Sequence, residues 1–426
     1  QNYTFTFNPS TSYAHSITDA TQTKCFGPWN TPHSLMANLY NASNAIVATS
    51  AQNVQIFVPD QNSCTATPLT GSPVRESTKP DTTGCPPPHL PSLAARWDVG
   101  GCQDACPAFA PVNALSPKAV VVDLRHFMAL GRGNVHQTIR DETLWACTMC
   151  QACVQECPVL IGHVDLISDM RRDLIGEGKL SGPPARTLHQ ISNQANPYGR
   201  PNSERMAWAE GLKVPTVESN PGFEYLFWVG CAAAFDPRAQ KIARATVQLF
   251  QKAGINFAVL GKEETCTGDP ARRMGDEFLF QERAQTNVET LTRRKVKKIV
   301  TACPHCYNTI KHEYPPFGGQ DEVQHHSSLL AELVSKGRIS DRATNGGEPV
   351  TLHDPCYLAR VNGEVDATRL VIGAGKNEQY REMPRCGKKT FCCGPGGGRR
   401  WFGETPPQRV TSLPAREANP RGGRTH

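Results

Sequence analysis

The spacing of hydrophobic and polar positions divides this 426-residue chain into parts of different character. Residues 1–95 hold 24 Ser or Thr but only 7 charged residues, and neither helical nor strand periodicity is sustained. We therefore expect an irregular segment there. From Ala119 the run AVVVDLRHFMALG has the spacing of an amphipathic helix, and residues 141–178 predict helices on both sides of a cysteine-rich loop. This pattern predicts a mainly helical domain over residues 96–180.

After Glu224 short apolar runs alternate with helical stretches, which is typical of an α/β fold. The runs EYLFWVGC, INFAVLG, KKIVTAC and PVTLHDPC predict strands. Residues 181–222 are rich in Pro, Asn and Ser around one helical pattern, so we expect a linker. The tail 404–426 carries no packable pattern. We expect an α/β chain, α+β overall, in which the helical domain precedes two α/β cysteine-rich domains at 223–345 and 346–403.

The 17 cysteines need a chemical reason, because a chain of this length can bury sizeable cores without covalent links. Many of them stand in CxxC and CxxCxxC runs, whereas disulfide scaffolds are usually short and disperse their cysteines. Metal ligation in a reducing cytoplasm explains them better. Three cysteines stand alone and are expected not to be ligands: Cys25, Cys64 and Cys85.

Charge and hydropathy limit the classes of partner that we expect for this chain. The net charge of +6 comes from scattered Lys and Arg, without the basic stripe interleaved with aromatics that nucleic acid requires, so we expect no nucleic-acid partner. No stretch approaches the 18 to 20 continuous apolar residues of a membrane helix. We also see no pattern of a secretory signal at the start of the sequence.

One cysteine run is typical of ferredoxins. In these proteins three cysteines of such a run hold one [4Fe-4S] cube and the fourth binds a neighbouring cube. Tetrahedral zinc favours separated CxxC pairs instead. The run predicts iron–sulfur ligation by Cys147, Cys150, Cys153 and Cys157, with Pro158 following.

A second ferredoxin run is only half present. Cys102 and Cys106 match its end, but Val99 and Arg96 stand where its first two thiolates belong. If ligands are exchanged between runs in the usual way, one complete cube is held by Cys147, Cys150, Cys153 and Cys106. The other cube would have only Cys102 and Cys157, so we expect it to be missing or unstable.

A cysteine repeat about 125 residues apart follows the ferredoxin pattern. Its first copy predicts a metal site at Cys231, Cys266, Cys303 and Cys306, and its second copy holds Cys356, Cys392 and Cys393. A closing CxxC would fall near position 430, so we expect the second copy to be incomplete and inert. By residue count alone, a structural zinc site in the first copy stays open.

We interpret two neighbouring features as structural rather than as phosphate-binding or metal-ligand sites. The glycines in Gly394–Gly398 precede no GKS or GKT, so we interpret them as allowing backbone to approach the thiolates closely rather than as a phosphate loop. The nearby histidines are expected to be hydrogen-bonding partners rather than ligands: His305, His312, His325, His326 and His353.

With these motifs, residues 102–402 resemble the cysteine-rich domains of heterodisulfide reductases and of glycolate-oxidase iron–sulfur subunits. The segments LWACTMCQACVQECPV, NPYGRPNSERMAWAEGLKVP, FWVGCAAAFD, EETCTGDPARR, CPHCYNTI and HDPCYLAR look most like the branch associated with electron-transferring flavoproteins. The resemblance implies a cytoplasmic iron–sulfur arm behind membrane helices that reach the quinone pool. Thr265 stands where the family pattern has the first cysteine of a CC pair. The unlike ends predict a truncated or frame-altered copy of a longer protein.

The resemblance implies an iron–sulfur oxidoreductase that relays electrons from a reduced electron-transferring flavoprotein, or another flavoprotein, toward membrane quinone. The full-length protein would then lie at the inner face of the cell membrane. We expect [4Fe-4S] clusters, and a non-cubane cluster or zinc in the cysteine-rich domains. We identify no acid–base catalytic residue. The alternatives are an electron-transfer subunit for heterodisulfide, thiol or 2-hydroxy-acid chemistry, and a zinc-stabilised scaffold without catalysis.

Overall fold

The computed structural model describes the backbone of residues 2–7, 16–17, 33–40 and 46–54, and residues 100–109, 115–130, 133–339, 350–373, 379–403 and 410–418. The chain forms two compact units. One comprises Gln1–Arg96 with Val159–Ile161, and the other comprises Trp97–Pro158 with Gly162–His426. All the cysteine motifs belong to the second unit. Cys25, Cys64 and Cys85 lie outside the described residues.

The first unit contains a four-stranded sheet in the order β2-β1-β3-β4. β1 and β3 are parallel, and the outer pairs are antiparallel. This sheet differs from the irregular segment that we expected, because β-strand preference depends on the surrounding structure more than on local sequence. The strands are β1 (Asn2–Phe7), β2 (Ser16–Ile17), β3 (His33–Tyr40) and β4 (Ile46–Val54).

The domain predicted to be helical consists of short helices around a buried cluster that includes Leu144 and Ile167. The loop between α5 and α6 has left-handed backbone at Met149 (φ 52°) and Gln151 (φ 60°), on both sides of Cys150. These two turns let successive cysteines face the same interior. The helices are α2 (Gly101–Asp104), α3 (Pro117–Leu130), α4 (Val135–Thr138), α5 (Asp141–Trp145), α6 (Ala152–Gln155) and α7 (His163–Gly176).

The segment 181–222, expected as a linker, forms α8 (Gly182–Gln194) and the 3-10 helix η1 (Asn202–Ala209). Ile191 of α8 and Trp208 of η1 are buried in two different cores of the cysteine-rich domain. Two of the prolines that suggested a linker, Pro183 and Pro184, stand in the first turn of α8, where proline is well tolerated. This segment is therefore part of the packed domain.

The first cysteine-rich domain is built on a parallel sheet in the order β6-β5-β7-β8. Residues alternate between its faces: Leu226 and Trp228 join one core, whereas Phe227 joins the other. Both faces are thus apolar, as parallel sheets require. The strands are β5 (Tyr225–Trp228), β6 (Phe257–Ala258), β7 (Lys298–Thr301) and β8 (Glu322–His325).

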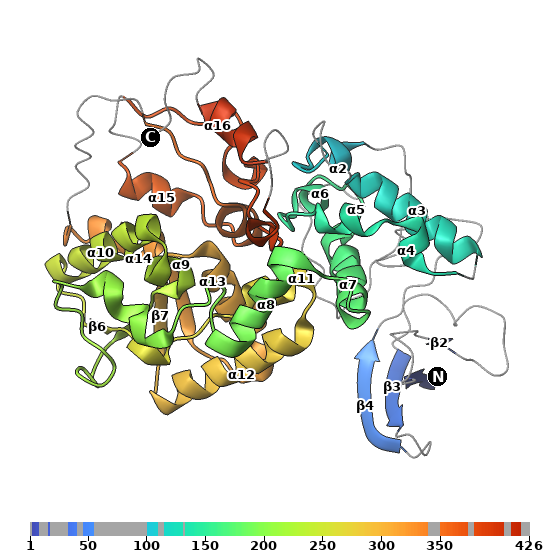
Figure 1. The fold of residues 1–426 in the computed structure, drawn as a ribbon, viewed down its shortest axis with the longest axis horizontal. Helices are drawn as coiled ribbons and strands as arrows, with labels where there is room; N and C mark the ends of the chain where they lie inside the picture. Colours follow the sequence, from blue (N-terminus) through green and yellow to red (C-terminus); the bar gives the residue numbers. More distant parts are fainter. Residues whose placement is uncertain are drawn as a thin grey trace. The chain divides into compact units, whose positions relative to one another are not determined.

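Helices cover both faces of this sheet (Figure 1). The core with Phe227 includes residues of α10 and α14, and the core with Leu226 includes residues of α11 and α12. Further short turns carry cysteines into the space above the strand ends. The helices are α9 (Gly230–Phe235), α10 (Pro237–Lys252), η2 (Gly261–Glu263), α11 (Asp269–Met274), α12 (Glu277–Arg293), α13 (Pro304–Asn308), η3 (Thr309–Glu313), η4 (Pro315–Phe317) and α14 (His326–Ser335).

The part after residue 350 has little regular structure among its described residues. The predicted strand PVTLHDPC shows only an isolated pairing of Val350 with Tyr380. The tail, expected to be irregular, contains α16 (Ser412–Ala418). The other elements are η5 (Tyr357–Val361), α15 (Asp366–Val371), η6 (Gly387–Lys389) and η7 (Arg399–Trp401). The chain as a whole mixes helix with a small parallel sheet, which is consistent with the expected α/β class.

Candidate metal centres

The cysteines predicted as ligands are free thiols. All fourteen cysteines between Cys102 and Cys393 are described and free, and most are buried. A single free cysteine is often buried in a protein core. Here, however, most of the buried thiols gather in three groups. Thiolate ligands for a metal are held in this way, because the thiolate is the form that binds.

The ferredoxin thiols form the first group. Cys106 lies near Cys147 and Cys150, and Cys153 lies near all three, so each raises the pKa of its neighbours. Burial is the largest cause of the raised pKa of Cys106 and Cys153. Cys102 lies beside Cys157 instead. The structure thus brings together the four cysteines that ligand exchange predicts for one cube, whereas Cys102 lies beside Cys157 and also near Cys153.

The first copy of the repeat forms the second group. Cys231 opens α9 directly after β5, Cys303 caps α13, and Cys266 precedes α11. These three and Cys306 line one cavity of about 340 Å³. Because three different strand or helix ends carry the thiols, their positions are fixed by the sheet.

Two thiols of this second group favour the thiolate. The hydrogen bond from Cys266, followed by the positive charge of Arg205, lowers the pKa of Cys231 to about 7. The hydrogen bond from Cys306 and the nearby His305 lower the pKa of Cys303 to about 6. The backbone N–H of Cys306 also donates to Cys303 Sγ over 3.4 Å. This donor set fits a metal or iron–sulfur group.

A buried ion pair that the sequence pattern did not reveal lies beside Cys231. Arg205 Nη2 lies 2.7 Å from Glu264 Oε1 and 3.5 Å from Cys231 Sγ. The Glu264 carboxylate also accepts from the N–H groups of Val229 (2.9 Å) and Gly230 (2.8 Å). Arg205 was missed because it lies in the segment expected to be a linker.

Residues next to the predicted ligands take other roles. The Thr265 hydroxyl, at the position of a family cysteine, donates to Asn287 Oδ1 over 2.7 Å. His305 Nδ1 pairs with Asp269 Oδ2 at 3.1 Å, and although burial lowers its pKa, Asp269 raises it to about 9. His312, His325 and His353 form hydrogen bonds with Asn362, Ala302 and Phe391 respectively.

The second copy of the repeat meets the ferredoxin loop. Cys392 interacts with Cys150, Cys356 and Cys393, and this contact with Cys150 and Cys356 lowers the pKa of Cys392. The pKa of Cys393 is likewise lowered by Cys392, whereas the pKa of Cys356 is raised by Cys392 and by burial. Cys150 therefore adjoins both the ferredoxin group and the second copy.

Cys386 follows a different pattern from these thiols. Burial and the nearby Glu382 raise its pKa, and the charged groups around it are those of Asp354, Glu382 and Arg369. It was not among the predicted ligands.

Two buried arginines form hydrogen bonds with both the ferredoxin loop and the second copy of the cysteine repeat. Arg171 Nη1 donates to Gly397 O (2.8 Å) while its Nη2 donates to Cys147 O (2.7 Å). Arg360 Nη1 donates to Cys150 O over 2.9 Å, and its Nη2 bonds to Thr390 O.

The glycine run takes part in this docking. A Cβ on Gly396 would lie 2.5 Å from Thr148 O, so only glycine admits the close approach. The glycines thus approach the backbone of the ligand loop.

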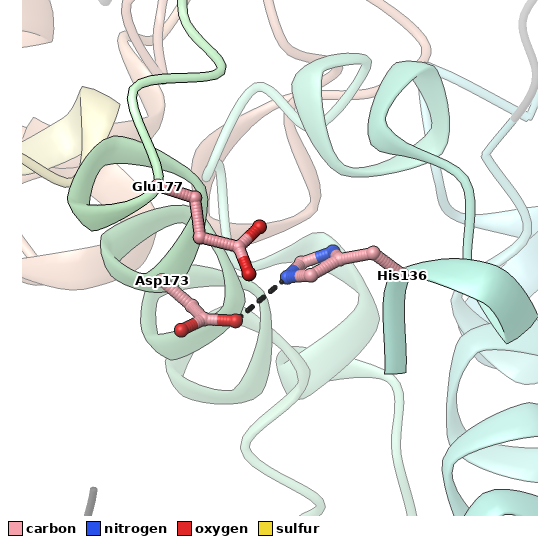
Figure 2. Close-up of side chains that lie close together, drawn as sticks. All are labelled: His136, Asp173 and Glu177. Carbon is pink, nitrogen blue, oxygen red and sulfur yellow. Dashed lines mark hydrogen bonds and ion pairs between the residues drawn. The ribbon is translucent and has the colours of Figure 1, made fainter. Parts of the chain in front are cut away.

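Another cluster of ligand-type side chains lies in the helical domain. Figure 2 shows His136 of α4 pointing at Asp173 of α7, with Glu177 beside them. His136 Nε2 lies 2.9 Å from Asp173 Oδ2, and Glu177 is paired with Lys179 at 2.6 Å. Since Lys179 already compensates Glu177 and both carboxylates are exposed, we assign this cluster to the contact between α4 and α7.

Comparison with known proteins agrees with this geometry. Residues 225–311 and 350–419 match the cysteine-rich domain family, and residues 98–161 match the 4Fe-4S dicluster domain family. The chain therefore contains a 4Fe-4S dicluster domain and two segments of the cysteine-rich domain family. The predicted iron–sulfur cofactors are thereby confirmed. No solved structure matches the chain.

Three relatives illustrate the range of this family. A probable iron-sulfur-binding oxidoreductase FadF of Bacillus subtilis is 37% identical over 76% of this chain and 53% of its own length. An EtfAB:quinone oxidoreductase of Syntrophomonas wolfei is 34% identical over 72% of this chain and 48% of its own. A component of the dihydromethanophenazine:CoB–CoM heterodisulfide reductase of Methanosarcina mazei is 29% identical over 73% of this chain and 80% of its own. The chain spans about half the length of the first two.

Proposed function

We propose that this chain relays electrons from a reduced electron-transferring flavoprotein toward membrane quinone. A bound iron–sulfur cluster supplies one-electron transfer at a potential that its surroundings set. In this proposal Cys106, Cys147, Cys150 and Cys153 hold a [4Fe-4S] cluster. A second centre is held by Cys231, Cys266, Cys303 and Cys306.

The observation that carries the proposal is the direct docking of the ferredoxin loop onto the cysteine-rich domains. Arg171 donates to carbonyl groups on both sides of this contact, at Cys147 and at Gly397. Arg399 Nη1 adds a bond to Trp145 O at 2.7 Å. A relay needs its centres held at fixed short range, and these buried bonds hold the ligand loops together.

The names of the relatives support the direction of transfer. The Syntrophomonas wolfei relative is named for flavoprotein and quinone, and another relative, from Chromohalobacter salexigens, is named a probable membrane-anchored ferredoxin. Among the described residues, none of the helices is long and apolar enough to cross a bilayer. We propose that in the whole protein this chain works at the cytoplasmic face of the membrane.

The test uses the full chain reconstituted anaerobically with iron and sulfide. Electron-transferring flavoprotein is added in catalytic amounts and kept reduced by its donor dehydrogenase with an excess of that enzyme's substrate, and the visible absorbance of the clusters is followed. We expect the absorbance to bleach with the wild-type chain and much less with Cys147→Ser. An unchanged spectrum of the wild-type chain, or zinc in place of iron after purification, would contradict the proposal.

A further inference from the structure

Arg205 is buried at the edge of the second group of thiols. Its side chain and that of Glu264 are each only 2% exposed, so neither charge is hydrated. The ring of Phe235 lies 5.6 Å from its guanidinium carbon and covers one face of the group. The other contacts of the guanidinium are to Glu264 and to Cys231 Sγ. The cation is therefore placed against a predicted ligand of the metal centre.

Among the described residues, two nitrogen atoms of the Arg205 guanidinium group remain without a hydrogen-bond partner. Within the described part of the chain, Arg205 Nε and Nη1 are buried without a hydrogen-bond partner. Each unpaired buried N–H costs about 1–3 kcal/mol, and more where the group is charged. A fold that retains two such donors beside a thiol has an acceptor for them in its working state.

Arg171 shows how this fold treats a buried guanidinium that is purely structural. It is fully buried as well, and all three of its nitrogens donate to backbone carbonyl oxygens. Those carbonyls belong to Leu144, Cys147, Arg273 and Gly397. The unpaired nitrogens of Arg205 are thus a local feature of the surroundings of Cys231.

Glu264 holds Arg205 in place, and both of its oxygens accept hydrogen bonds. Its two oxygens accept from Val229 N, Gly230 N and Arg205 Nη2, so it fixes the turn that presents Cys231. Gly230 has φ +80°, and a Cβ there would lie 3.5 Å from Cys306 Sγ. The carboxylate therefore acts as an anchor, and the guanidinium is the group free to donate toward the sulfur side.

We propose that Arg205 is a positioning residue that donates hydrogen bonds to the sulfur atoms of the first-repeat centre and raises its reduction potential. The inference rests on the proposed ligand role of Cys231, Cys266, Cys303 and Cys306. Reduction adds negative charge to the centre, and nearby donors and positive charge stabilise the reduced state. Loss of the guanidinium therefore lowers the potential.

The experiment is a redox titration of the reconstituted full chain followed by EPR. The signal that disappears in Cys231→Ser identifies the first-repeat centre. The main variant is Arg205→Gln with Glu264→Gln, because it leaves no unpaired buried charge, and the amide oxygen at position 264 can still accept from one of the two N–H groups of Val229 and Gly230. Glu264→Gln alone is its reference, since the two proteins differ only in the guanidinium. Arg205→Lys keeps the charge but loses the planar fork.

Arg244→Gln is the matched control. Arg244 holds the same 3-10 helix through Trp208 O (2.6 Å) and Glu210 O (2.8 Å), and both of these bonds go to backbone carbonyls. It therefore tests whether loosening η1 is enough to alter the centre.

We expect the double variant to keep its iron and, relative to Glu264→Gln, to shift the equilibrium at least tenfold toward the oxidised form, about 59 mV for one electron. Arg205→Lys should shift it less, and Arg244→Gln should not shift it. Loss of first-repeat iron in both Arg205 variants but not in Arg244→Gln also supports donation to the centre.

Equal potentials in the double variant and in Glu264→Gln overturn the inference. Equal loss of iron in Arg244→Gln overturns it too, because η1 would then act only as a support. If the wild-type chain shows no signal that Cys231→Ser removes, the ligand assignment itself fails, and the inference fails with it.

Discussion

Burial raises the pKa of thiols in both complete groups, but hydrogen bonds outweigh it at two thiols of the first repeat. In the ferredoxin group it raises the pKa of Cys106 and Cys153, so these thiols stay protonated until a cation displaces the proton. In the first repeat, hydrogen bonds from partner thiols hold Cys231 and Cys303 nearer the thiolate. Metal binding should therefore release more protons at the ferredoxin group than at the repeat.

Cys150→Ser should remove the ferredoxin cluster and lower the iron content by about four per chain, because Cys150 faces the other thiols of that group. Cys386→Ser is the matched control, since the charged neighbours of Cys386 are carboxylates and an arginine. Iron counting after anaerobic reconstitution measures both. Equal losses from the two substitutions would refute the grouping.

His326 should make the chain sensitive to acid. Burial lowers its pKa to about 4, and His325, whose ring lies 4.6 Å away, has a pKa lowered to about 3. Both bind protons more readily when unfolded, where the pKa is about 6.5, so stability falls as the pH drops below that value. Tyr307 is the other titratable ring beside this pair.

For His326 alone, the free energy of unfolding should fall by about 2 kcal/mol between pH 7 and pH 5. His326→Leu should flatten the decline by that amount in urea titrations of the metal-free chain, whereas the exposed His189→Gln should leave it unchanged. If the free energy of unfolding falls equally with pH in the wild type and in both variants, His326 is not the cause of the acid sensitivity.

Elements with strong local patterns could be predicted, and those stabilised by distant partners could not. β5 and β7 are apolar runs buried on both faces and were predicted, whereas β8, with the polar sequence EVQH, pairs only at the edge of the sheet. The run PVTLHDPC is apolar enough to suggest a strand, yet only Val350 finds a pairing partner among the described residues.

The residues of the candidate site could likewise be predicted only in part. Cysteine spacing identified the thiols, because ligand geometry imposes a spacing on the sequence. It could not identify Arg205 and Glu264, whose contacts with Cys231 and Gly230 bridge residues far apart in the chain. A buried ion pair leaves no periodic trace.

The glycine run offers a test of docking between elements. A Cβ on Gly397 would lie 2.4 Å from Cys147 O, so Gly397→Ala must push the ligand loop away. We expect a loss of more than about 3 kcal/mol, together with loss of ferredoxin iron, since overlap adds to the cost of positive φ.

Gly403→Ala is the control for that substitution. Gly403 also has positive φ (+72°), but no described atom lies within 4 Å of its added Cβ. It should cost about 1 kcal/mol and keep the iron. Similar effects from both alanines would mean that backbone strain, not docking, explains the loss.

At the level of the whole second unit, two arginines and a glycine run bring the ferredoxin loop and the second repeat into one interior. Arg360 bonds to both Cys150 O and Thr390 O, and Cys150 itself contacts Cys392. Cys150 can complete only one centre at a time. If it belongs to the ferredoxin cluster, the second repeat is left with Cys356, Cys392 and Cys393.

This competition predicts the iron content of the chain. The reconstituted wild type should hold about eight irons if the first-repeat centre is also a cube, and Cys356→Ser should leave that number and the EPR signals unchanged. Cys231→Ser, on the intact first repeat, should remove one centre and serves as the positive control. If Cys356→Ser instead abolishes a centre that Cys153→Ser leaves in place, Cys150 serves the second repeat, and the ferredoxin group is the incomplete one.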